Sequence, residues 1–195
     1  MSRIVPIRLL SALFASLAAV AATAAPATYT LDPDHTYPSF EADHMGISLW
    51  RGKLDKSTGK VVLDREAGTG TLEVSLDPAS IDFGQQALNK WARGKEFFDI
   101  AKHPKASYKG TFERFVDGAP TRVAGELTLH GVTKPVELRI ERFKCIQHPM
   151  LKREYCGADA YGSFDRSAFG LDAGKDYGFD MNVALRIQVE AVRDK

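Results

Sequence analysis

The chain has 195 residues, of which 44% are hydrophobic and 26% are charged, and its formal net charge is +1 at pH 7. This length suits a single domain that buries a sizeable hydrophobic core. The near balance of 26 basic and 25 acidic residues gives no electrostatic reason to bind nucleic acid or an anionic membrane. Composition therefore excludes the strongly basic classes of binding protein and indicates a globular domain.

The N-terminus has the pattern of an export signal. Two arginines precede the apolar stretch 9–20, and residues 22–24 (Ala-Thr-Ala) supply the small side chains that a signal peptidase requires. The apolar stretch is about 12 residues long, against about 20 for a helix that spans a bilayer. We therefore expect residues 1–24 to be a cleaved signal peptide and residues 25–195 to be a periplasmic domain without a transmembrane segment.

Alternating apolar and polar residues predict strands through the first half of this domain. Extended segments separated by short turns are expected at residues 28–31, 39–44, 49–54, 60–64 and 71–77. Residues 85–93 then contain good helix formers that end at Gly94, and residues 97–100 have the character of a second helical turn. One or two short helices are therefore expected to carry aromatic side chains against the end or mouth of a sheet.

Strands resume after this insert. They are expected at residues 105–115, 121–130, 136–143, 159–166 and 179–191. Within the run Gly125–Ile140, two alternating segments flank His130–Pro135, which must reverse the chain to form a β-hairpin. Strands of about ten residues exceed the typical five or six, and this length favours a tilted barrel without free edges. The predicted fold is an all-β, eight-stranded antiparallel barrel.

The two cysteines, Cys145 and Cys156, suit the oxidising compartment that an exported protein enters. Their even number favours a disulfide that closes the loop between them. The alternative is a metal site made of Cys145, His148 and Cys156, although three ligands at this spacing are untypical of zinc proteins. The disulfide is the preferred interpretation, and no bound metal is expected.

Sequence motifs give little support for catalysis. The chain lacks a G-x-S-x-G elbow, an H-E-x-x-H pair and a glycine-rich phosphate loop. An enzyme would require His35, His44 and an acid such as Asp34 to converge, and this hypothesis ranks third. We expect a protein that is not an enzyme, with no catalytic residues and no cofactor.

Aromatic residues are frequent in and beside the predicted strands. For any one of them, ordinary core packing is the simpler explanation, because large aromatic side chains fill cores routinely. Taken together, a barrel lined by Phe, Met and Leu beneath an aromatic helix suits a long apolar ligand. The sequence alone leaves open whether the barrel is filled or hollow.

Several short motifs occur in a fixed order along the mature chain. They are Asp34-His35-Thr36, His44-Met45-Gly46, Ser80-Ile81-Asp82, Phe97-Phe98-Asp99, the run LTLHGVTKP from Leu127 to Pro135, and Arg166-Ser167 with Phe169-Gly170. In these motifs the chain resembles the YceI-like family of secreted, lipocalin-like polyisoprenoid-binding proteins. The resemblance implies an extended eight-stranded barrel with a deep apolar cavity for an isoprenoid chain. It also implies that fatty-chain amphiphiles are alternative ligands and that a homodimer is compatible with the family.

The leading hypothesis is a periplasmic protein that sequesters or carries a long-chain isoprenoid lipid of the quinone or polyprenyl type. Its expected ligand-binding residues are Phe40, His44, Met45, Trp50, Phe97, Phe98, Phe112, Phe164, Arg166, Phe169 and Met181. Of these, His44 or Arg166 is expected to meet the polar head group. The competing hypothesis is a non-catalytic partner of a membrane redox or cytochrome complex, for which the barrel is a docking scaffold.

Overall fold

The computed structural model describes residues 25–195, and the expected signal peptide lies outside this range. The described chain contains one α-helix, α1 (Gln86–Arg93), and twelve strand segments. The strands are β1 (Ala27–Leu31), β2 (Tyr37–His44), β3 (Ser48–Leu54), β4 (Ser57–Asp64), β5 (Thr69–Leu76), β6 (Ile81–Asp82), β7 (Ala106–Val116), β8 (Ala119–Leu129), β9 (Val132–Pro135), β10 (Leu138–Gln147), β11 (Glu154–Asp165) and β12 (Asn182–Arg193). Three 3₁₀ turns complete the secondary structure: η1 (Pro78–Ser80), η2 (Arg166–Phe169) and η3 (Lys175–Tyr177). Within residues 25–195, no helix has the length and apolar character needed to cross a bilayer.

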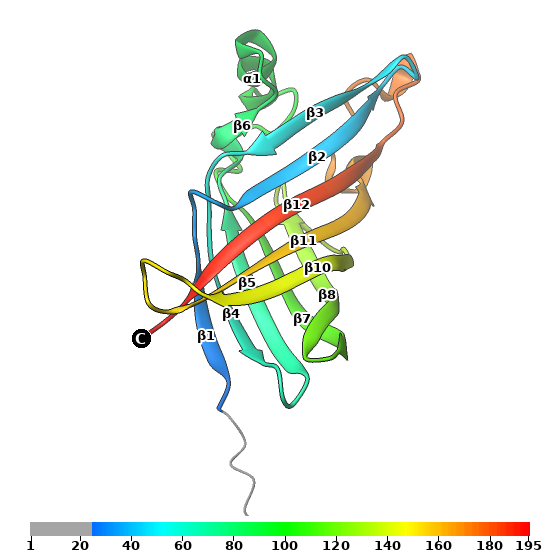
Figure 1. The fold of residues 1–195 in the computed structure, drawn as a ribbon. Coiled ribbons are helices and arrows are strands. Elements are labelled where there is room, and N and C mark those ends of the chain that lie inside the picture. The colour runs from blue at the N-terminus through cyan, green and yellow to red at the C-terminus, as the bar shows by residue number, and fades with distance from the viewer. Residues whose placement is uncertain (1–24) are drawn as a thin grey trace, which may run out of the picture.

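The sheet closes on itself (Figure 1). Antiparallel neighbours follow the order β1-β4-β5-β7-β8-β10-β11-β12, and β12 pairs back with β1. β2 continues the line of β1 after a short break, and both pair with β12. In the same way β3 continues the line of β4, since β3 pairs with β2 and β4 pairs with β1. Each of these two pairs of segments counts as one barrel strand. The described residues therefore form an eight-stranded antiparallel barrel, which confirms the predicted fold class. The second helical turn expected at residues 97–100 is instead a series of hydrogen-bonded turns after α1.

Strand alternation decides which side chains face the interior. Along β12 the inward positions are Val183, Leu185, Ile187, Val189 and Ala191. A bulge in β10 changes this phase: the register with β11 shifts between Ile140 and Arg142, so that Ile140 and Phe143 both face inward. The barrel wall is therefore apolar on the inside along its length and polar on the outside.

The hairpin predicted within Gly125–Ile140 is present, but its turn is shorter than expected. Leu129 pairs with Val132, so only His130 and Gly131 form the loop, with φ angles of 52° and 77°. Positive φ at both central residues is the geometry of primed hairpin turns, which match the twist of the flanking strands. The six-residue reversal predicted for His130–Pro135 is wrong, because Val132–Pro135 already pair with β8 as β9.

Replacing Gly131 with alanine is expected to lower the free energy of unfolding by about 1–2 kcal/mol, since the left-handed conformation disfavours any Cβ. An alanine Cβ would also lie 3.1 Å from Cε1 of His103. Gly178→Ala is the matched control: its φ is 81° and no atom lies within 4 Å of the added Cβ. Chemical denaturation should show the larger loss for Gly131→Ala. Unchanged stability in both variants would contradict the left-handed geometry.

Candidate ligand cavity

The barrel encloses a cavity of about 280 Å³ with side chains from each of the eight long strands in its wall. One end is bordered by Tyr29, Leu63 and Cys156, which are buried, and we call it the closed end. At the other end Trp50 and Phe179 are partly exposed, and we call this the mouth. Ligand pockets commonly measure about 300–1,000 Å³. A cavity of this modest volume that extends along the barrel is narrow, and it suits one extended chain better than a bulky ring system.

Polar groups of the cavity wall are bonded to the protein itself. The Tyr108 hydroxyl donates to the backbone carbonyl of Val136 at 2.7 Å, and the Tyr29 hydroxyl donates to Glu154 Oε2 at 2.9 Å. The Thr36 hydroxyl donates to a backbone carbonyl of β12 at 3.1 Å. Because these groups are already paired, they do not require hydrogen bonds from a ligand. The interior is therefore suited to hydrocarbon.

Arg166 is a buried cation in the wall near the mouth. Its guanidinium donates to the backbone carbonyls of Leu171 at 2.5 Å and Ala173 at 2.8 Å, and it lies 5.8 Å from the ring centroid of Phe97. Burial lowers the pKa of this side chain, but an arginine stays protonated at any physiological pH. Both hydrogen bonds hold the segment after η2, so the main role shown by the geometry is to fix the chain beside the mouth.

The structure brings most of the expected ligand-binding residues to one cavity. Those in its wall are Phe40, Trp50, Phe97, Phe98, Phe112, Phe164 and Arg166. The remaining four, His44, Met45, Phe169 and Met181, do not line it. Phe97 and Phe98 reach the cavity from the turns after α1, in agreement with the aromatic insert expected at the mouth.

The four residues outside the wall have separate physical reasons for their positions. Phe169 lies in η2 and is 1% exposed, packed edge-on against Phe164 behind the cavity surface. Met181 is buried just before β12 begins. Met45 occupies the exposed turn between β2 and β3, and His44 ends β2 beyond the enclosed part of the wall. The alternation of side chains along a strand predicts which residues face inward, but it does not predict where along the strand the cavity ends.

An aromatic group surrounds the mouth. The imidazole of His44 stacks on Trp50 with ring centroids 4.2 Å apart, and Phe179 meets His44 edge-on at 5.1 Å. Phe83 contacts Phe40 edge-on at 5.5 Å. The site prediction omitted Phe179 and Phe83, although both line the cavity. Phe179 was detectable, because it continues the alternation of the last strand, whereas Phe83 follows a two-residue strand with no periodic signal.

The residues required for the enzyme hypothesis do not converge. His35 Nδ1 lies 2.9 Å from Asp32 Oδ2 in the turn between β1 and β2, and this bond raises the pKa of His35. His44 lies at the opposite end of β2, against Trp50. The two histidines are therefore separated by the length of β2, and neither lines the cavity.

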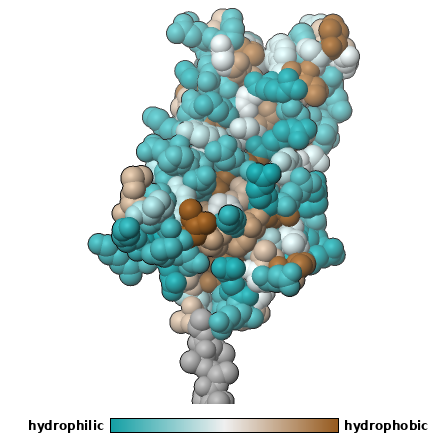
Figure 2. Space-filling model, viewed as in Figure 1, coloured by the Kyte–Doolittle hydropathy of each residue, from teal (hydrophilic) through white to brown (hydrophobic). Residues whose placement is uncertain are grey.

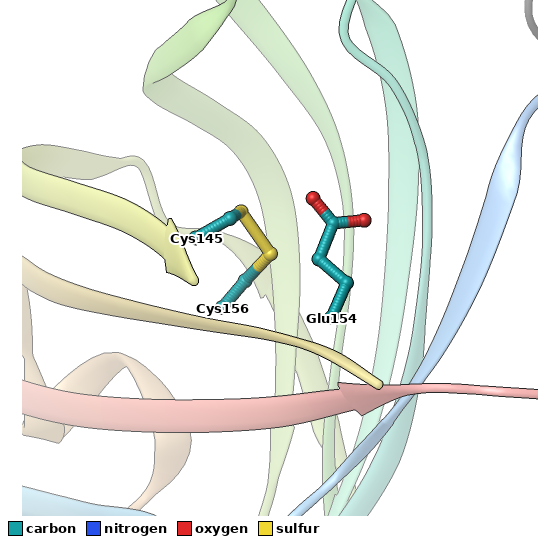
Figure 3. Close-up of side chains that lie close together, drawn as sticks. All are labelled: Cys145, Glu154 and Cys156. Carbon is teal, nitrogen blue, oxygen red and sulfur yellow. A yellow bond between two sulfur atoms is a disulfide. The ribbon is translucent and has the colours of Figure 1, made fainter. Parts of the chain in front are cut away.

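Cys145 and Cys156 form the predicted disulfide, which closes the chain around the turn between β10 and β11. The two cysteines are direct partners in the β10–β11 ladder. Figure 3 shows the carboxylate of Glu154 beside them, and within residues 25–195 these three form the one group with metal-ligand spacing, their atoms lying within 4.8 Å. Zinc binds thiolate sulfur, whereas both sulfurs here are bonded to each other. The metal set with His148 is wrong, since the His148 imidazole instead accepts hydrogen bonds from two turn amides.

Buried tyrosines make alkaline stability a test of the interior. Burial, with a hydrogen bond to Glu154, raises the pKa of Tyr29 to about 12. Burial also raises the pKa of Tyr108 and of Tyr155. A pKa above the unfolded value of about 10 adds stability below pH 10 that is lost as pH rises toward 12. In an alkaline titration followed by ultraviolet absorbance, the tyrosinate signal of these residues should therefore appear together with unfolding. Ionisation of Tyr29 near pH 10 in the folded protein would contradict its burial.

Residues 25–195 thus form a lipocalin-like barrel that encloses a narrow apolar cavity. The family model described as "YceI-like domain" matches residues 29–191, and the chain therefore belongs to the YceI-like family. Protein YceI of Escherichia coli O157:H7 is 30% identical over 191 residues, which cover 96% of this chain and 98% of that protein.

Two solved structures show the same fold at lower sequence identity. Burkholderia cenocepacia BcnA superposes with a TM-score of 0.65 at 21% identity, covering 82% of this chain and 98% of BcnA. A polyisoprenoid binding domain from Saccharophagus degradans, implicated in plant cell wall breakdown, superposes with a TM-score of 0.61 at 17% identity, covering 85% and 98%. These likenesses support the barrel architecture independently of the family assignment.

Proposed function

We propose that this protein binds a long-chain isoprenoid lipid of the quinone or polyprenyl type, with the hydrocarbon tail inside the barrel. The observation that carries the proposal is the narrow cavity whose wall is apolar and whose hydroxyl groups are paired within the protein. The Saccharophagus domain of the same fold is described as polyisoprenoid binding, which supports this ligand class.

Burial of the tail supplies the affinity. Each methylene removed from water contributes about 0.8 kcal/mol, so three methylenes contribute about 2.4 kcal/mol before the costs of association. The mouth carries His44, and Asp43 lies in the wall beside it, so side chains that can meet a polar head group are present at this end. The lipid therefore enters tail first, and its head group stays at the mouth.

Export to the periplasm is part of the same proposal. The disulfide between Cys145 and Cys156 and the signal pattern in residues 1–24 both support an oxidising compartment outside the cytoplasm. There the barrel would shield a water-insoluble lipid between membranes. This role needs neither a metal nor a cofactor.

Organic extraction of the protein purified from its native periplasm, followed by mass spectrometry, tests the proposal. The expected result is a co-purifying long-chain isoprenoid near one molecule per protein. Absence of any long-chain lipid, together with no binding of an added isoprenoid quinone, would contradict it. A membrane cytochrome that co-purifies with an empty barrel would favour the redox-partner hypothesis instead.

A further inference from the structure

The turn between β2 and β3 and the start of β3 expose apolar side chains that the fold does not bury. Met45, Ile47 and Leu49 are 49%, 77% and 50% exposed, and Tyr177 in η3 is 77% exposed. Figure 2 shows hydrophobic residues gathered at the upper right of the molecule, over this end of β2 and β3. We call these four side chains the apolar tip. Because these side chains are exposed, they do not stabilise the hydrophobic core.

The apolar tip is continuous with the cavity mouth. Trp50 lines the cavity, and Leu49 precedes it on the opposite face of β3. Phe179 lines the cavity two residues after Tyr177. The two segments are joined, because the amide of Asp180 donates to a carboxylate oxygen of Asp43 and the rings of Trp50 and Phe179 lie 6.4 Å apart. In Figure 1 the β2–β3 turn and the segment before β12 meet at the same corner. The apolar tip therefore lies at the rim of the cavity mouth.

The charge of the turn restricts the partner. Residues 45–50 contain no Asp, Glu, Lys or Arg, and the Asp43 carboxylate that precedes them accepts the amide of Gly46 at 3.0 Å. Beside Tyr177 the exposed charges are of both signs, Lys175 and Asp176. A basic partner or an anionic surface would find no opposite charge on this turn. Exposed aliphatic and aromatic side chains without charge suit insertion at the interface of a bilayer.

A second exposed apolar turn provides a comparison. Met150 and Leu151 are 81% and 46% exposed in the β10–β11 turn, and Ile146 at the end of β10 is 45% exposed. This turn adjoins the disulfide near the closed end, it carries Lys152 and Arg153, and none of its exposed apolar residues is followed by a mouth residue. Exposure alone therefore does not distinguish the two turns, whereas continuity with the cavity does.

We propose that the apolar tip inserts into the interface of a zwitterionic phospholipid bilayer and sets the cavity mouth against the membrane. The isoprenoid chain then passes between bilayer and barrel without crossing water. This inference rests on the proposed lipid-binding function. It adds the surface from which the ligand is collected or to which it is delivered.

Sedimentation with phosphatidylcholine vesicles tests the docking. Ile47→Ser with Leu49→Ser removes two large aliphatic side chains from the bilayer interface, so it should lower the vesicle partition coefficient at least about tenfold. Met150→Ser with Leu151→Ser is the matched control and should partition like the parent. Partition should persist between about 0.1 and about 1 M salt, where the screening length falls from about 10 to about 3 Å. Failure of the parent to bind, an equal loss in the control, or binding that requires anionic lipid would overturn the proposal.

Ligand uptake separates this inference from the function on which it rests. Isoprenoid presented in detergent should bind the Ile47→Ser/Leu49→Ser variant as it binds the parent, while uptake from vesicles should slow about tenfold. The docking role would be overturned if the variant took up isoprenoid from vesicles as fast as the parent. It would also be overturned if the variant lost binding in detergent as much as it lost uptake from vesicles. If the parent docked on vesicles yet bound no isoprenoid, the ligand assignment would fail and the membrane surface would stand.

Discussion

Phenylalanine in place of Ala158 is expected to weaken binding of a long-chain isoprenoid about fiftyfold while the barrel stays folded. Ala158 lies in β11 with its side chain in the cavity wall, between positions that also face inward. A ring there would occupy the space of about three methylenes, which corresponds to about 2.4 kcal/mol of lost burial. Titration with an isoprenoid quinone measures the change in Kd, and the Trp50 fluorescence at the mouth offers a signal.

Ala184→Phe is the control for this prediction. Ala184 belongs to β12 but alternates out of phase with Val183 and Leu185, so its side chain lies on the outer face. The same substitution there adds the same ring without entering the cavity. Binding should be unchanged. If Ala158→Phe bound as tightly as the parent, or if both variants lost affinity equally, the ligand would lie elsewhere.

Loss of the disulfide is expected to lower the free energy of unfolding by about 3 kcal/mol in the chain-entropy treatment of a loop of this length. The sequence separation of Cys145 and Cys156 is 11 residues. For a domain of this size, that loss corresponds to a fall in Tm of about 6–12 °C. Thermal denaturation of a Cys145→Ala/Cys156→Ala variant measures it.

Reduction provides an independent check. Dithiothreitol should lower the Tm of the parent toward that of the double alanine variant and should leave the variant unchanged. An oxidised parent with the same Tm as the variant would show that the β10–β11 hydrogen bonds already hold these strands and that the bridge adds no stability.

Local sequence patterns predicted the fold because each barrel strand records its two faces in alternate residues. The alternation from Val183 to Ala191 and the helix formers of Gln86–Arg93 both correspond to elements of the structure. The hairpin turn was misjudged because the sequence does not mark that His130 takes a left-handed conformation. A histidine tolerates it better than most residues, but Gly131 alone carried the signal.

The site was harder to predict than the fold because a cavity depends on distances between strands. Phe112 and Phe164 face inward by phase and line the cavity, whereas Met181 is equally apolar and packs outside it. Phe83 enters the wall through a turn before α1, where no periodic pattern exists. Composition therefore indicated an apolar interior, while its boundaries required the three-dimensional structure.

A crystal structure of the protein with a long-chain isoprenoid quinone tests the central claim most directly. The account predicts one continuous tube of density from Trp50 and Phe179 at the mouth toward Leu63 and Cys156 at the closed end, with the head group outside. Density confined to the outer surface, or a barrel whose interior is closed by its own side chains beside Ala158, would contradict it.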